Sequence, residues 1–313
     1  MEAVIEKIQR LRRERNAVIL AHNYQVGPIQ DIADFTGDSL GLTLAAQKTD
    51  AKIIVFCGVH FMAETASILC PEKIVLVPDL SAGCGLADMV TAPALKQWKA
   101  AHPGAAVVCY INTTAAVKAE CDYCVTSSNA EKVIRAIPAD REILFAPDKY
   151  LGAWVMKKTG RTMHLWPGYC PTHVRIDPEY IIRYKTAHPE TEYLVHPECG
   201  CLTGTMHLAD AVLSTDGMVR RARESAAREF LIATEVGMLH RLEKENPEKR
   251  FHPAGPNARC EHMAVNDMEG VLASLEDLRY EVKVPTELAI RARVCIDRML
   301  EITRTPEPVP AGV

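Results

Sequence analysis

Short apolar segments recur along the chain, and each follows an amphipathic stretch and ends on polar side chains. The segments cover 17–21, 105–109 and 192–195, and polar residues follow each of them. A short apolar run between turn signals is typical of a buried strand, whereas the 3.6-residue spacing before it is typical of a helix. The pattern therefore predicts helices that alternate with strands.

This helix-strand pattern repeats about every 87 residues. The polar strand ends begin at His22, Tyr110 and His196, with spacings of 88 and 86 residues. A hydroxyl residue follows each of these strands, and we expect it to open a helix. These residues are Ser39, Ser127 and Thr215, at spacings of 88 and 88. Two further strands are expected in each unit. They cover 52–56 and 73–77 in the first unit, 142–145 and 162–166 in the second, and 229–233 and 250–252 in the third. Each third strand runs into a proline and then a cysteine, which is Cys84, Cys170 or Cys260.

A threefold repeat of this kind predicts an α/β fold made of three pseudo-threefold-related small α/β domains. Each domain is a short parallel sheet with flanking helices, and all three surround a central active site at the carboxyl ends of the strands. The expected boundaries are 1–90, 91–176 and 177–284, and each unit holds one of the repeated cysteines. Residues 285–313 are expected to form a C-terminal helix and a tail.

Composition and charge narrow the possible partners. The 313 residues are 48% hydrophobic and 24% charged, with a net charge of −4 and no basic stripe, so a nucleic acid is not an expected partner. The N-terminal segment lacks the apolar core and cleavage site of a signal peptide. No apolar run reaches the ~20 residues that span a bilayer. We therefore expect no membrane contact and a cytoplasmic location.

Eleven cysteines without an export signal favour metal or redox chemistry over disulfides. Cys57, Cys109 and Cys295 lie in apolar surroundings and are expected in the core. The repeat would instead bring Cys84, Cys170 and Cys260 to one point. A closed structural zinc site needs four ligands, whereas three separate cysteines fit an iron-sulfur cluster with one open, Lewis-acidic iron. A weaker alternative is a zinc-stabilised binding module that uses Cys121 and Cys124, whereas Cys199 and Cys201 have no counterpart in the repeat.

Polar residues at the strand ends are the remaining candidates for chemistry. A hydroxyl at the start of a helix helps to bind anions, although each of Ser39, Ser127 and Thr215 alone would be read as an N-cap. Glu198 and His196 place a carboxylate and an imidazole close together, which suits general acid-base catalysis. The other strand-end groups are His22, Tyr24, Tyr110 and Asn112.

Motifs in the right order over nearly the whole chain resemble those of the quinolinate synthase family, the iron-sulfur enzymes of de novo NAD biosynthesis. The matching stretches are Ala21-His22-Asn23-Tyr24, Ser81-Ala82-Gly83-Cys84, Tyr110-Ile111-Asn112-Thr113-Thr114, Thr126-Ser127-Ser128-Asn129, Pro167-Gly168-Tyr169-Cys170, His196-Pro197-Glu198-Cys199, Ser214-Thr215 and Cys260-x-x-Met263.

The resemblance implies that the chain condenses iminosuccinate with dihydroxyacetone phosphate to give quinolinate, phosphate and water. It implies a [4Fe-4S] cluster on Cys84, Cys170 and Cys260. Catalytic roles carry over to Glu198, His196, Tyr24 and Tyr110. The implied substrate contacts are His22, Ser39, Tyr110, Asn112, Ser127, His196, Glu198 and Thr215. The pathway also suggests a transient contact with L-aspartate oxidase, which makes iminosuccinate.

Another reaction class is compatible with a three-domain, three-cysteine frame. It is an iron-sulfur reductase or radical enzyme, such as those of isoprenoid or diphthamide synthesis. The strand ends His196-Pro197-Glu198 and Tyr110-Ile111-Asn112 argue against this alternative, because they resemble quinolinate synthase and not those families.

Overall fold

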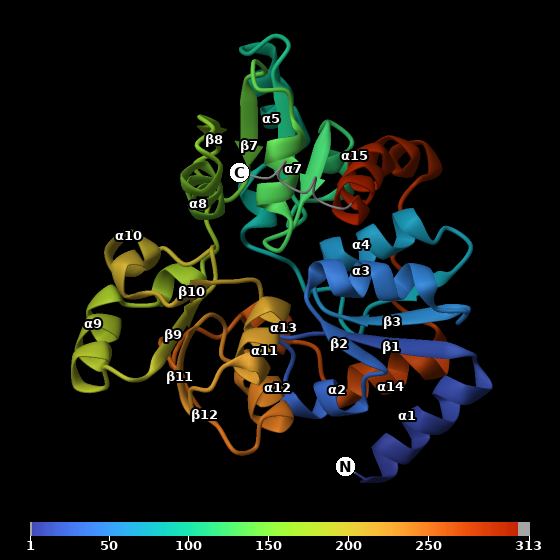
Figure 1. The fold of residues 1–313 in the computed structure, drawn as a ribbon. Coiled ribbons are helices and arrows are strands. Elements are labelled where there is room, and N and C mark those ends of the chain that lie inside the picture. The colour runs from blue at the N-terminus through green and yellow to red at the C-terminus, as the bar shows by residue number, and fades with distance from the viewer. Residues whose placement is uncertain (1, 306–313) are drawn as a thin grey trace.

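The computed structural model describes residues 2–305, which form three parallel four-stranded sheets with helices around them (Figure 1). The first sheet contains β1 (Ala17–His22), β2 (Phe35–Gly37), β3 (Ile53–Cys57) and β4 (Ile74–Leu76). The second contains β5 (Ala106–Tyr110), β6 (Tyr123–Val125), β7 (Ile143–Ala146) and β8 (His164–Leu165). The third contains β9 (Glu192–Val195), β10 (Ala211–Val212), β11 (Glu229–Ala233) and β12 (Arg250–Pro253).

The strand order is the same in all three sheets. The orders are β2-β1-β3-β4, β6-β5-β7-β8 and β10-β9-β11-β12, and every pairing is parallel. Parallel strands with both faces covered are expected to be uniformly apolar, and the strands β3, β5, β7 and β9 are buried along their whole length. The prediction of three α/β units with short parallel sheets is therefore confirmed.

Helices separate successive strands in each unit, as the repeat predicted. The first unit has α1 (Glu2–Glu14), α2 (Gly27–Ile32), α3 (Ser39–Lys48) and α4 (His60–Leu69). The second has α5 (Ala92–Ala100), α6 (Ala115–Lys118), α7 (Ala130–Ala136) and α8 (Lys149–Thr159). The third has α9 (Pro178–Ala187), α10 (Leu202–Thr205), α11 (Thr215–Glu224) and α12 (Met238–Glu245), and α13 (Glu261–Ala264), α14 (Met268–Asp277) and α15 (Thr286–Arg304) follow. Single 3₁₀ turns occupy Ala87–Met89, His173–Arg175 and Met206–Leu208.

One strand in each unit was not expected from the sequence. The edge strands β2, β6 and β10 have only two or three residues, too few to show an alternating or continuous apolar pattern. The segment with Cys121 and Cys124 was interpreted as a connection between a strand and a helix. That interpretation was wrong for Cys124, which lies on β6 opposite Cys109 of β5.

Two C-terminal helices return to earlier parts of the chain. Helix α14 packs against α1 and β3, although its residues follow the third sheet in sequence. Helix α15 packs against α4 of the first unit and against α6, α7 and β6 of the second, and Figure 1 shows it between these two units. The boundaries near 90 and 176 stay predictions, and the expected tail lies outside the described residues from 306 onward.

The attachment of α14 gives a test of how the first sheet is stabilised. Leu275 on α14 is fully buried in a core with Ile19 and Val55, whereas Glu269 on the same helix is exposed. We expect Leu275→Ala to lower the free energy of unfolding by about 2–5 kcal/mol, because it leaves a cavity in a packed core. Glu269→Ala should change it by less than about 0.5 kcal/mol. Urea denaturation would measure both, and equal effects would contradict the packing described.

Candidate active site

A cavity of about 240 Å³ lies at the carboxyl ends of the central strands, and it is lined by residues of all three units. Parallel strands end at the same edge of a sheet, so polar residues that follow them collect there. All twelve residues singled out from the sequence line this cavity, namely His22, Tyr24, Ser39, Cys84, Tyr110, Asn112, Ser127, Cys170, His196, Glu198, Thr215 and Cys260. No helix among residues 2–305 is long and apolar enough to cross a membrane.

Each unit supplies one cysteine to the cavity from the loop after its fourth strand. Cys84, Cys170 and Cys260 are half-buried and free. Burial raises the pKa of all three thiols, to about 12 for Cys84. The three sulfur atoms do not all lie within 4.8 Å of one another, since no such group occurs among the described residues. A single zinc ion with Zn–S bonds of ~2.3 Å would need them about 3.8 Å apart, which is closer than all three lie here.

Glu198 is a buried carboxylate of the cavity, with 3% of its surface exposed. Its Oε2 lies 3.0 Å from Nδ1 of His173, and its Oε1 accepts a long hydrogen bond from the Asn112 amide at 3.5 Å. Burial by itself raises the pKa of Glu198. The neighbouring His173 and His196 and a hydrogen bond from Tyr110 outweigh that effect, and they lower the pKa to about 2. The carboxylate is therefore ionised at pH 7.

The imidazole in contact with the Glu198 carboxylate is that of His173, whereas Nδ1 of His196 accepts a hydrogen bond from the Glu198 backbone N–H at 3.4 Å. Nε2 of His196 lies 3.2 Å from the Ser127 hydroxyl, and its ring stacks on His173 at 5.1 Å between centroids. Burial lowers the pKa of His196 to about 3 and that of His22 to about 4. Both rings are thus neutral at pH 7 and can donate or accept a hydrogen bond.

A short chain of hydrogen-bonding groups runs back from Glu198. His173 Nε2 lies 2.9 Å from the Thr234 hydroxyl, and the Tyr24 hydroxyl lies 3.3 Å from the same nitrogen. Burial raises the pKa of Tyr24 and Tyr110 well above the usual value, so both phenols keep their protons. Glu198, His173, Thr234 and Tyr24 thus form a connected path along which a proton can move.

The hydroxyls of Ser39, Ser127 and Thr215 are not N-caps. The side chains that cap α3 and α11 belong to the preceding residues, Asp38 and Ser214. Helix α7 begins only at Ala130, so Ser127 lies before the helix and does not open it as expected. The three hydroxyls face the cavity, where those of Ser127 and Thr215 contact His196 and Asn23.

Among the lining residues that the sequence interpretation missed are His173 and Glu235. His173 follows Cys170 by three residues and joins Glu198 to Thr234, but no repeat position marks it. Glu235 lies two residues after the end of β11, so the strand-end rule could have identified it. Its carboxylate accepts backbone hydrogen bonds from Gly237 at 2.6 Å and from Cys260 at 3.1 Å. Burial raises the pKa of Glu235 to about 7.

The remaining cysteines lie outside the cavity lining. Cys199 and Cys201 form a disulfide, although the sequence favoured metal or redox chemistry over disulfides for the cysteines. Only Gly200 separates them, and their Cα atoms are 5.2 Å apart, within the range that a disulfide bridges. Cys57, Cys109 and Cys295 are fully buried, as expected, and Cys121 and Cys124 lie in the same core as Cys109.

The fold and the cavity define a three-unit α/β enzyme whose single active site is shared by all units and holds one cysteine from each. The quinolinate synthetase A protein (NadA) family matches residues 6–301. The chain belongs to this family, and its function is that of a quinolinate synthase, an enzyme of NAD biosynthesis.

Similar proteins cover the chain almost completely. A quinolinate synthase of Thermus thermophilus is 54% identical over 303 residues, which are 96% of this chain and 98% of the relative. The quinolinate synthase of Geotalea uraniireducens is 50% identical over 97% of this chain and 99% of its own. A solved structure of the E-1-hydroxy-2-methyl-but-2-enyl-4-diphosphate reductase of Plasmodium falciparum is 12% identical, with a TM-score of 0.32 over 89% of this chain and 85% of that one. A TM-score of this size does not establish a shared fold.

The neutral, buried imidazoles predict acid sensitivity. The unfolded chain protonates His22 near pH 6.5, whereas the folded chain does so only near pH 4. This contribution to stability is therefore complete above pH 6.5 and is lost as the pH falls toward 4, by about 1.4 kcal/mol per pH unit. We expect His22→Asn to flatten the dependence of the unfolding free energy on pH in this range, as measured by urea denaturation. His207→Asn, at an exposed position, should leave the slope unchanged.

Proposed function

We propose that the chain condenses iminosuccinate with dihydroxyacetone phosphate to quinolinate, phosphate and water, with a [4Fe-4S] cluster bound by Cys84, Cys170 and Cys260. The observation that carries the proposal is the single cavity in which one free cysteine from each sheet faces a buried carboxylate and neutral imidazoles. Membership of the quinolinate synthetase A protein family supports the reaction.

The cysteine arrangement supports a cluster rather than one metal ion. The thiols line one cavity, and their three sulfur atoms do not all lie within 4.8 Å of one another as three ligands of one ion would. Three protein thiolates leave one of four irons without a cysteine. When bound, the cluster supplies a Lewis-acidic iron that polarises a substrate oxygen and helps to expel water.

Binding of iminosuccinate requires donors for two carboxylates. The hydroxyls of Ser39 and Thr215 lie at the N-termini of α3 and α11, where free backbone N–H groups and the helix dipole favour an anion. Ser127 and the Asn112 amide face the same cavity from the second unit. His22, His196 and Tyr110 add neutral donors. We infer that these groups hold the dicarboxylate and leave Glu198 free for proton transfer.

The proton transfers fall to Glu198 and the groups in contact with it. The ionised Glu198 accepts a proton from the substrate, and His173 shares that proton through the 3.0 Å contact. His196 and the protonated phenols of Tyr24 and Tyr110 donate to oxygens that gain charge as phosphate and water leave.

Two parts of the proposal concern the surroundings of the enzyme. The free cysteines of the cavity would stay reduced in the cytoplasm, which is where we expect the reaction. A transient contact with L-aspartate oxidase stays a prediction from the chemistry of an unstable imine. The iron-sulfur reductase or radical alternative is disfavoured by family membership.

The proposal is tested by anaerobic purification, followed by analysis of iron, sulfide and zinc and an assay of quinolinate after both substrates are added. We expect about four irons and four sulfides per chain together with product. A cluster without product would favour the reductase or radical class. Zinc alone would show that the cysteines bind a different metal.

The cluster ligands are distinguished by single substitutions. Cys84→Ala, Cys170→Ala and Cys260→Ala should each abolish iron incorporation and turnover, because each removes one of three thiolates. Cys121→Ala and Cys124→Ala should keep the iron content, because both thiols lie in the core outside the cavity lining. The reverse pattern in iron analysis would overturn the ligand assignment.

The proton acceptor is tested by Glu198→Gln. The amide keeps the shape of the side chain but accepts no proton, so quinolinate formation should fall by at least about 10²-fold while iron and the brown absorption stay. Glu269→Gln, on the exposed face of α14, is the matched control and should retain full turnover. Full activity of Glu198→Gln would remove Glu198 from proton transfer.

A further inference from the structure

A second group of metal-ligating side chains lies at the opposite edge of the second sheet from the cavity. His102 follows α5, Glu142 directly precedes β7, and His164 is the first residue of β8. The strands are parallel, so their starting points share one edge, just as their carboxyl ends share the cavity edge. Two imidazoles and one carboxylate therefore meet at a place that the reaction does not use.

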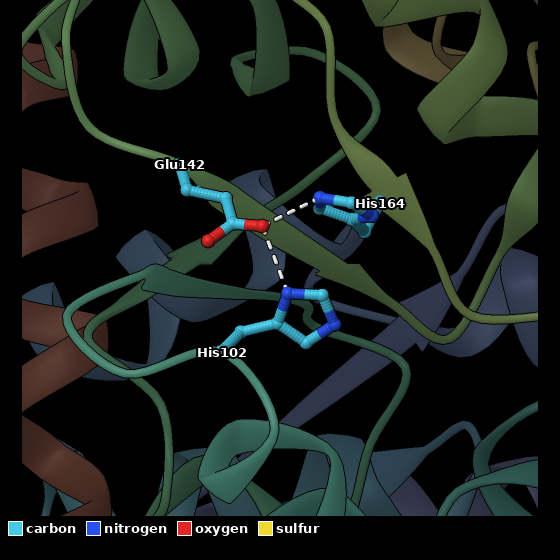
Figure 2. A group of neighbouring side chains, drawn as sticks. All are labelled: His102, Glu142 and His164. Carbon is cyan, nitrogen blue, oxygen red and sulfur yellow. Dashed lines mark hydrogen bonds and ion pairs between the residues drawn. The ribbon is translucent and has the colours of Figure 1, made fainter.

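Both imidazoles converge on the same carboxylate oxygen. Nδ1 of His102 lies 2.8 Å and Nε2 of His164 lies 2.6 Å from Oε1 of Glu142, and the two ring centroids are 4.5 Å apart. Figure 2 shows the two rings reaching Glu142 from two directions. Two groups among residues 2–305 bring three or more potential ligand atoms within 4.8 Å of one another. One is this group, and the other contains Cys170, His173 and Glu198.

We propose that His102, Glu142 and His164 bind a divalent first-row transition metal ion, and zinc first of all. Two imidazoles and one carboxylate, with the remaining positions open to water, are a recurrent ligand set for zinc and for ferrous iron. Bonds of 2.0–2.2 Å place the ligand atoms of tetrahedral zinc about 3.3 Å apart. The side chains need to separate by only about half an ångström from their present contacts to admit the ion.

The charge around Glu142 also favours a cation. Within the described part of the chain, no Lys or Arg makes an ion pair with this carboxylate, whose only partners are the two imidazoles. An imidazole carries charge only when it is protonated. The neighbouring Arg141 is used elsewhere, since its guanidinium donates to the carbonyls of Gly104 and Ala105. The negative charge of Glu142 is thus left for an ion to neutralise.

Hydrogen bonds hold the backbone around the His102, Glu142 and His164 group, and two of its side chains are exposed to solvent. The hydrogen bonds from Arg141 join the strand of Glu142 to the turn that carries His102. The ring of Trp98 packs edge-on against His102 at 6.2 Å between centroids. The side chains of Glu142 and His164 are 42% and 48% exposed, so an ion and its water ligands can enter without opening the core.

Zinc content distinguishes the group from the cluster site. The cluster-loaded protein is dialysed anaerobically against Zn²⁺ and then analysed for zinc, iron and sulfide in the same sample. We expect one zinc per chain in addition to the full iron content. His164→Ala and Glu142→Gln should weaken zinc binding by about tenfold or more while iron and quinolinate formation stay unchanged. His252→Ala is the matched control, because His252 pairs with Glu229 but belongs to no group of three potential ligands among the described residues, and it should bind zinc normally.

Quenching of tryptophan fluorescence by Ni²⁺ provides a second test of the metal site. It depends neither on quinolinate formation nor on metal analysis. Ni²⁺ quenches the fluorescence of a nearby indole, and Trp98 lies next to His102. We expect Ni²⁺ alone to quench part of the tryptophan emission in the wild-type chain, and His164→Ala or Trp98→Phe to remove that part. Equal zinc binding by the wild type and His164→Ala, or zinc that appears only as iron is lost, would overturn the proposal.

Discussion

The structure depends on one geometric constraint, which is that three parallel sheets end their central strands at a common cavity. A parallel strand covered on both faces can present polar side chains only where it ends. The strands β1, β5 and β9 are buried up to their last residues, and the polar groups begin at His22, Tyr110 and His196. No single unit could enclose the site, because each contributes only one wall and one cysteine.

Burial then sets the protonation of the groups that meet there. Burial opposes every charge, so the imidazoles of His22 and His196 and the phenols of Tyr24 and Tyr110 are neutral. Glu198 is the exception, because His173 and its other polar neighbours stabilise its charge more than burial opposes it. One cavity can therefore hold an ionised carboxylate and several neutral proton donors at the same pH, which the proposed loss of phosphate and water would use.

Contacts next to the cavity hold the three units together. Asn23 follows β1 and donates to Thr215 and Asp216 at the start of α11, and Arg241 of α12 contacts both Asn23 and Asp216. These hydrogen bonds join the first and third units directly behind the site. Helix α15 joins the first and second units through a shared apolar core. The second sheet also carries the His102, Glu142 and His164 group at its far edge, where a bound ion would hold the starts of β7 and β8 to the turn before β5.

The sequence by itself determined the three α/β units, their central strands and twelve of the residues that line the cavity. Each of these depends on local periodicity or on a repeat of about 87 residues, and both are properties of the linear chain. Only the tertiary structure decided the partners of those residues. His173 becomes the partner of Glu198 because the loop after β8 folds toward β9, and α14 returns to β3, across more than two hundred residues. Contacts between distant segments depend on how whole units pack, and no local pattern of hydrophobic and polar positions encodes that packing.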